Sequence, residues 1–153
     1  MPDDPAKDDI GGRFFAFLTE VGIIAQLSRA MLEQRLPDGV TAAQYGVLNH
    51  LVRVTDGGTP LELARAFQVP KTTMSHVLAG LEKRGLVEMR PNESDLRSKQ
   101  VWLTDAGRRF RDDAVALLGD DIERLSKKID TEKLAELTPE LVKIRKVLDD
   151  DRN

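Results

Sequence analysis

The sequence predicts a mainly α-helical chain with one small two-stranded β-ribbon, on three observations. Most apolar residues recur at steps of three and four, the spacing of one face of a helix. Val87 and Met89 alternate with Glu88 and Arg90, and Val101 and Leu103 alternate with Gln100 and Trp102, a period of two that is typical of two short strands. Charged residues make up 32% of the 153 residues, somewhat above the usual quarter, as is common in helix-rich proteins.

Composition narrows the classes of function. The chain has no cysteine, which excludes disulfides, thiolate metal sites and thiol catalysis and suits a reducing compartment. The acidic start MPDDPAKDDI is unlike a secretory signal, and apolar runs stay as short as FFAFL, so we expect a cytoplasmic protein without a membrane segment. Neither His50 nor His76 has a sequence-local acid or nucleophile partner, and no metal-binding or phosphate-loop motif occurs. We therefore expect neither cofactor nor metal, and no enzyme.

The first part of the chain predicts a tail and two helices. Residues 1–9 hold four Asp and two Pro and are expected to form a disordered acidic tail. Helical periodicity follows over 10–36 and stops at the PDG turn, 37–39. Thr41 and Gln44 have the spacing of a capping box, which predicts the start of a second helix that the TDGG turn at 55–58 closes.

The middle of the chain predicts two helices joined by a tight turn. Thr59, Pro60 and Glu62 combine a cap residue, a proline at the first helical position and a capping-box glutamate. This third, short helix is expected to reach about Phe67, where QVP at 68–70 interrupts it. A fourth helix then runs to Gly85, and its buried stripe is Met74, Val77, Leu78 and Leu81.

The remaining sequence predicts the ribbon and further helices. Two strands within 87–103 flank a polar tip, 91–99. Thr104 is expected to cap a fifth helix of about seven turns that continues to Ile129. A last apolar seam follows over 134–148, and Pro139 within it predicts a kink or restart with Thr138 as the cap.

Charge is unevenly distributed along the chain. The formal net charge is −3, which by itself argues weakly against a nucleic-acid partner. From residue 59 to 109, however, nine basic and six acidic residues leave +3, whereas 14 basic and 20 acidic residues elsewhere leave −6. The positive field is therefore concentrated in the middle third of the chain.

Two features of the middle third of the chain indicate binding to double-stranded DNA. If the apolar stripe of the fourth helix packs inward, its opposite face presents hydroxyl groups, one imidazole and lysines, and no acidic residue lies between Pro70 and Leu81. The ribbon tip offers Arg97, a long and permanently charged side chain suited to a narrow minor groove, with Asp95 placed to hold its guanidinium. A short helix, a turn, a two-faced helix and a basic hairpin together make a winged helix-turn-helix.

The same residues resemble a known family. The run TAAQYGVL, LARAF and KTTMSHVLAGLEKRGLVEMRPNESDLRSKQVWLTDAG is similar to the multiple-antibiotic-resistance-regulator (MarR) family of transcriptional regulators. LEKRGLV, the wing pattern D-x-R-S-K and LTDAG are the most specific segments. The resemblance implies a homodimer that binds pseudo-palindromic operator DNA and is often released by a small ligand.

The resemblance also assigns roles to individual residues. It implies a DNA-binding set made of Lys71, Thr72, Thr73, Ser75, His76, Arg97, Ser98 and Lys99, with Asp95 positioning the wing. Many relatives have glycine where this chain has Gln68, a polar residue in place of Pro70 and arginine in place of His76. These departures put base preference in question. By the same analogy an effector would bind near Tyr45, His50 and Arg53, although the residue pattern favours a structural role for His50.

The expected organisation is a single domain over 10–153. Helices at 10–36 and 108–150 are expected to dimerise, because their apolar stripes are too long for the lobe at 41–107, with its wing at 87–103, to cover. Intramolecular packing of these helices is the alternative. The predicted function is a sequence-specific DNA-binding regulator, a repressor relieved by a small molecule. A winged-helix module that binds another protein is the rival, and a small-molecule binder without DNA function is a second one.

Overall fold

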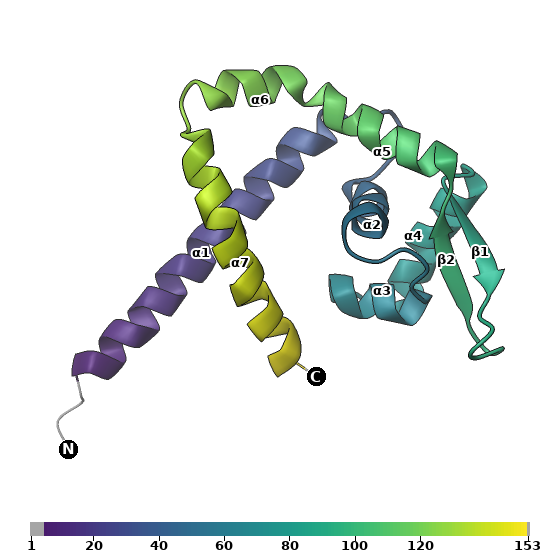
Figure 1. Ribbon diagram of the computed structural model, residues 1–153, viewed down its shortest axis with the longest axis horizontal. Helices are drawn as coiled ribbons and strands as arrows, with labels where there is room; N and C mark the ends of the chain where they lie inside the picture. Colours follow the sequence, from purple (N-terminus) through teal and green to yellow (C-terminus); the bar gives the residue numbers. More distant parts are fainter. Residues whose placement is uncertain (1–4, 153) are drawn as a thin grey trace. The chain divides into compact units, whose positions relative to one another are not determined.

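The computed structural model describes residues 5–152, which form two compact units (Figure 1). The larger unit ends at Leu117 and the smaller begins at Leu118. The larger contains α1 (Pro5–Glu33), α2 (Ala42–Arg53), α3 (Pro60–Phe67), α4 (Lys71–Lys83), β1 (Val87–Pro91), β2 (Lys99–Leu103) and α5 (Asp105–Leu117). The smaller contains α6 (Gly119–Ser126) and α7 (Thr131–Asp151). The predicted mainly helical class with a small β-ribbon is confirmed.

Both predicted capping boxes are present. The hydroxyl of Thr41 accepts from the Gln44 amide at 3.1 Å, and the Gln44 side chain accepts from the Thr41 amide at 3.2 Å. Thr59 and Glu62 make the same reciprocal pair at 3.2 and 2.7 Å. Each box satisfies two amides that a helix start would otherwise leave without partners, so both helices begin where the sequence predicted.

The turn between α3 and α4 follows the predicted break at 68–70. Gln68 caps α3 in the left-handed region at φ 53°, ψ 44°, a conformation in which a non-glycine residue is strained. Pro70 is the N-cap of α4 and makes no side-chain cap hydrogen bond. At the other end, Gly85 at φ 70° allows the chain to turn, and α4 ends at Lys83 as expected.

The ribbon pairs in one antiparallel register, with Val87 opposite Leu103 and Pro91 opposite Lys99. The loop after α2 adds a short third segment to its edge, because the Gly57 amide donates to the Val101 carbonyl and the Val101 amide donates to Gly58, both at 2.9 Å. The predicted wing over 87–103 is therefore present, and it starts from a fixed base rather than from an isolated hairpin.

A single apolar core holds α2, α3, α4 and the ribbon together. Its buried side chains come from all of these elements: Val47, Leu48, Leu51, Leu63, Ala64, Met74, Leu78, Leu81, Leu86, Val87 and Val101. The predicted inner stripe of α4 is confirmed, since Met74, Leu78 and Leu81 are at most 2% exposed and Val77 packs against them. We call residues 41–104, the part of the larger unit that surrounds this core, the winged-helix lobe. Figure 1 shows the ribbon beside α4.

The C-terminal part differs from the prediction in two places. The expected seven-turn helix is interrupted at Leu118, next to Gly119, whose backbone freedom disfavours a helix interior. The expected start at Thr138 is wrong: α7 begins at Thr131, where the Asp130 carboxylate accepts from two first-turn amides. The helix then runs through Pro139, while the Thr138 hydroxyl donates back to the Leu134 carbonyl at 2.8 Å.

The N-terminal boundary also moves. Residues 1–4 of the predicted tail lie outside the described residues, but 5–9 belong to α1, so the expected tail boundary at residue 9 is wrong. A proline fits the first turn of a helix because its missing N–H has no partner there anyway. From residue 9 to residue 30 every α1 side chain is exposed. The stretch Asp9–Glu33 is long and apolar enough to span a membrane by length and composition, a test that protein-covered helices also pass.

Candidate nucleic-acid interface

The exposed face of α4 carries the predicted base-contacting residues. Its solvent-facing side chains are Lys71, Thr72, Thr73, Ser75, His76, Ala79, Glu82 and Lys83, and Glu82 is the only acidic residue among them. They are presented by a helix whose other face is almost completely buried, so the lobe fixes their orientation. Hydroxyl and imidazole groups in this arrangement can hydrogen-bond base edges or phosphates.

The start of α4 is suited to phosphate. Because Pro70 provides no side-chain cap, that residue contributes no acceptor to the first-turn amides of α4, and the helix dipole adds partial positive charge there. The side chain of Lys71 is exposed at the same end. An anionic oxygen bound there would accept hydrogen bonds from the first-turn amides and would be attracted by the positive charge of the helix end and of Lys71.

The tip of the ribbon is built by side chains that cap its own backbone. The Asp95 carboxylate accepts from the Arg97 amide at 3.0 Å, and the same oxygen lies 3.5 Å from Nε of Arg97. Ser98 donates to the Asp95 carbonyl at 3.3 Å and accepts from the Asn92 amide group at 3.0 Å. The predicted DNA-binding residue Ser98 is thus half-buried and holds the loop.

Arg97 itself projects from this tip. The Arg97 side chain is 95% exposed, and its Nε–Oδ1 distance of 3.5 Å to Asp95 is long for an ion pair. An exposed ion pair of ordinary geometry stabilises a protein by only about 0.2–1 kcal/mol. Lys99, the first residue of β2, is also exposed. Asp95 therefore shapes the loop chiefly through backbone bonds and leaves the Arg97 guanidinium largely free to contact another molecule.

The wing is tied to the helices by a residue that sequence reasoning missed. One carboxylate oxygen of Asp56 accepts from the Gly57 amide at 3.1 Å and from the Leu103 amide at 2.9 Å. Trp102 lies against Gly57, where a Cβ atom would approach the indole ring to 2.5 Å, so only glycine fits. The sequence marked TDGG only as a turn, because no local pattern announces a bond to a strand 47 residues away.

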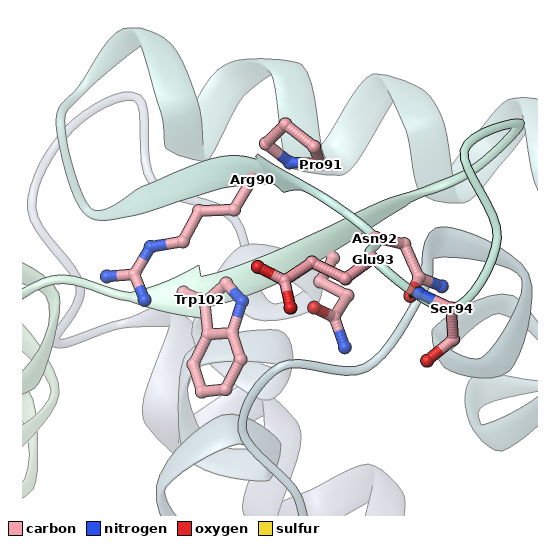
Figure 2. A pocket seen from close by; sticks show the side chains of 7 residues that line it. Arg90, Pro91, Asn92, Glu93, Ser94 and Trp102 are labelled. Carbon is pink, nitrogen blue, oxygen red and sulfur yellow. Dashed lines mark hydrogen bonds between the residues drawn. The ribbon is translucent and has the colours of Figure 1, made fainter.

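A second unpredicted feature lies on one face of the wing. Arg90, Pro91, Asn92, Glu93, Ser94, Gln100 and Trp102 line an open depression (Figure 2). The Arg90 guanidinium lies 5.1 Å from the centre of the Trp102 ring and pairs with Glu88. Such a cation–π contact stabilises by about 0.5–1 kcal/mol at an exposed site and joins the two strands of the wing.

The three residues suggested for effector binding all lie on or beside α2. Tyr45 and His50 are half-buried and Arg53 is exposed. The His50 ring packs against Phe67 with centroids 5.5 Å apart, which fits the structural role that the residue pattern favoured. Arg111 of α5 donates to the Asn49 side chain at 3.1 and 3.0 Å and so fastens α5 to this part of α2. The depression shown in Figure 2 is elsewhere, and effector binding at α2 stays a prediction.

Comparison with known proteins agrees with this architecture. The family model for the MarR family matches residues 38–98. The multiple antibiotic resistance protein MarR of Escherichia coli K12 is 32% identical over 117 residues, which cover 76% of this chain and 81% of that protein. The chain belongs to the MarR family. It is a transcriptional regulator with a winged-helix DNA-binding fold, in a family of regulators rather than enzymes.

A second relative and a solved DNA complex add to this comparison. The transcriptional regulator HosA of Escherichia coli O157:H7 is 32% identical over 98 residues, 64% of this chain and 70% of HosA. A crystal structure of a cysteine-to-serine mutant of Escherichia coli MarR, complexed with operator DNA, superposes with a TM-score of 0.65. It is 28% identical and covers 86% of this chain and 95% of its own. That MarR-family structure supports the assignment of DNA binding to the same fold here.

Proposed function

We propose that the protein is a homodimeric, cytoplasmic repressor that binds a pseudo-palindromic operator and releases it when a small molecule binds. The observation that carries the DNA-binding part is the exposed face of α4, which has no acidic residue before Glu82 and is held by a closed core next to a wing that exposes Arg97 and Lys99. In a dimer, two such helices would enter successive major grooves about ten base pairs apart.

The dimer proposal rests on the terminal helices. Large apolar side chains of α1 and α7 are exposed, among them Phe15 at 77%, Leu27 at 66% and Val147 at 67%. Apolar faces of this extent are normally covered, and a second copy of the chain supplies two matching helices. Glu20 lies near the midpoint of Asp9–Glu33, where a membrane would place its carboxylate in the bilayer centre, a position at which an aspartate costs about 2.5–3.5 kcal/mol. Protein cover is therefore the better account of α1.

Repression and its relief by a ligand would follow from the geometry of the proposed dimer. A dimer that occupies a promoter blocks access, and a ligand that favours a different spacing of the two lobes would weaken binding. The absence of cysteine fits a reducing compartment. Tyr45, His50 and Arg53 remain the proposed contacts for such a ligand, on the family resemblance alone.

The first test is fluorescence anisotropy on the intergenic duplex beside the protein's own gene, at two salt concentrations with scrambled duplex as competitor. We expect tight binding that resists the competitor and falls with salt, with a slope near −0.9 for each neutralised phosphate on logarithmic axes. Binding no stronger than to scrambled DNA would send the search to fragments selected from the whole genome. If no fragment is preferred, the protein-interaction module, which the net charge of −3 favours, replaces this proposal.

The wing supplies a sharper prediction. Arg97→Ala should lower operator affinity by about 1–3 kcal/mol and reduce the salt slope by about one phosphate, because it removes an exposed cation without touching the core. Leu96→Ala, the neighbouring change at an 86% exposed residue, is the matched control and should leave both quantities unchanged. Analytical ultracentrifugation should give the same oligomeric state for both variants. Unchanged affinity in Arg97→Ala would mean that the wing does not contact DNA.

A further inference from the structure

The exposed face of α4 is unusual in the kind of side chain that it lacks. Between Lys71 and Lys83 its exposed positions up to residue 79 carry threonine, serine, histidine and alanine: Thr72, Thr73, Ser75, His76 and Ala79. None is arginine, lysine, asparagine, glutamine, aspartate or glutamate. Those are the residue types that recognise guanine or adenine through two hydrogen bonds, or accept from cytosine N4.

Apart from His76 and the charged residues at the two ends of the helix, this face presents methyl and hydroxyl groups. Hydroxyls bond donors and acceptors alike and so discriminate weakly among bases. Methyl groups of Thr72, Thr73 and Ala79 can distinguish one base, because thymine alone presents a methyl group in the major groove. Thr72 and Thr73 lie in the first turn of α4, the end of a recognition helix that contacts base edges. Short side chains also allow the helix backbone to approach the bases closely.

We propose that α4 selects its operator chiefly through thymine methyl groups, contacted by the methyls of Thr72 and Thr73. This inference rests on the proposed function and adds the chemical mark that the helix recognises. It follows that each half-site carries thymines where the first turn of α4 faces the groove, and that guanine contributes little to recognition there.

His76 is the competing source of specificity on this face. Its imidazole offers one hydrogen bond toward a base edge, and guanine N7 is a strong acceptor in the groove. A single bond from this ring would make the operator depend on guanine instead of thymine. The two possibilities predict opposite responses to changes of single atoms in the DNA.

The experiment uses the full-length protein and the operator found as described above. Each thymine in a half-site is replaced in turn by uracil, which deletes only the methyl group, and each guanine by 7-deazaguanine, which deletes only N7. We expect about a fourfold loss of affinity at each contacted thymine, as for removal of one buried methyl group, and less than twofold at every guanine. Thymines outside the half-sites serve as controls. A larger loss at a guanine than at any thymine would overturn the proposal in favour of His76.

A pair of protein variants assigns the methyl contacts. Thr72→Ser and Thr73→Ser remove one methyl group and keep the hydroxyl, whereas Thr72→Val and Thr73→Val keep the methyls and remove the hydroxyl. In the serine variant the uracil substitution at the partner thymine should cost less than twofold, and in the valine variant it should still cost about fourfold. A full uracil effect in both serine variants would overturn the assignment. Both positions are exposed, and circular dichroism checks that α4 is intact.

Failure of this inference is separable from failure of the proposed function. Specific binding to the unmodified operator is measured first and does not depend on which atoms are recognised. If that binding is absent, the proposed function fails. If it is present and uracil substitution has no effect at any position, only the thymine proposal fails.

Discussion

The winged-helix lobe and the terminal helices use their apolar residues in opposite ways. In the lobe, Leu48, Leu78 and Leu81 are completely buried among side chains from every element of the lobe. In α7 no residue is buried, and Leu134, Leu137, Leu141 and Leu148 are each between 42% and 49% exposed. The difference teaches that the lobe closes its core within one chain, whereas the apolar side chains of α7 stay exposed, which is the basis of the dimer proposed above.

The largest predicted effect is a loss of stability in the winged-helix lobe. Leu78→Ala should reduce the free energy of unfolding by about 3–5 kcal/mol, because it removes a fully buried side chain and leaves a cavity among α2, α3 and the ribbon. Leu96→Ala, at an exposed residue of the wing tip, should change it by less than about 0.5 kcal/mol. Urea denaturation followed by circular dichroism measures both. Equal effects would show that the lobe does not depend on its core as described.

The second predicted effect is a loss of dimer affinity when the apolar face of α7 is changed. Leu141→Glu should raise the dimer dissociation constant on the order of a hundredfold, about 3 kcal/mol, because it places two charges in the proposed apolar interface. Lys146→Glu changes charge on the same helix at an exposed residue outside the apolar seam and should act far more weakly. Sedimentation equilibrium provides the measurement. A parent chain that is monomeric at all concentrations would remove the premise that a second copy covers α7.

The smallest effect lies within the lobe, at the turn before α4. Gln68→Gly should stabilise the protein by about 0.5–1 kcal/mol, because glycine adopts the left-handed conformation at φ 53° without the strain that a Cβ atom brings. The loss of chain freedom on folding offsets part of the gain. Ala66→Gly, two residues earlier within α3, should instead destabilise by about 1 kcal/mol. Thermal unfolding of the two variants tests whether glycine raises the stability at position 68 and lowers it at position 66.

The same contrast separates what the sequence could predict from what it could not. Capping boxes at Thr41 and Thr59, the inner stripe of α4 and the ribbon depend on residues close together in sequence, and each was predicted correctly. The start of α7 was missed because Pro139 appeared to forbid a helix, while the cap provided by Asp130 was overlooked. A proline inside a helix is tolerated when nearby backbone groups find other partners, and this depends on the three-dimensional context.

The candidate site divides in the same way. The exposure of Thr72, Ser75 and His76 follows from helical periodicity, and the structure agrees. The role of Ser98 does not, because its hydroxyl joins Asn92 to Asp95 within the loop instead of facing outward. Wing residues such as Asn92 belong to types that form turns through their own side chains, so their composition was the signal that could have revealed this.

The carboxylate of Asp56 has a mechanical consequence. By holding the amides of Gly57 and Leu103 with one oxygen atom, it joins the end of the wing to the loop that leads into α3. Bending the wing away from the helices would break the hydrogen bond that Asp56 accepts from Leu103. The wing and α4 should therefore move together as one rigid body. A ligand that weakens DNA binding would then have to shift the whole winged-helix lobe.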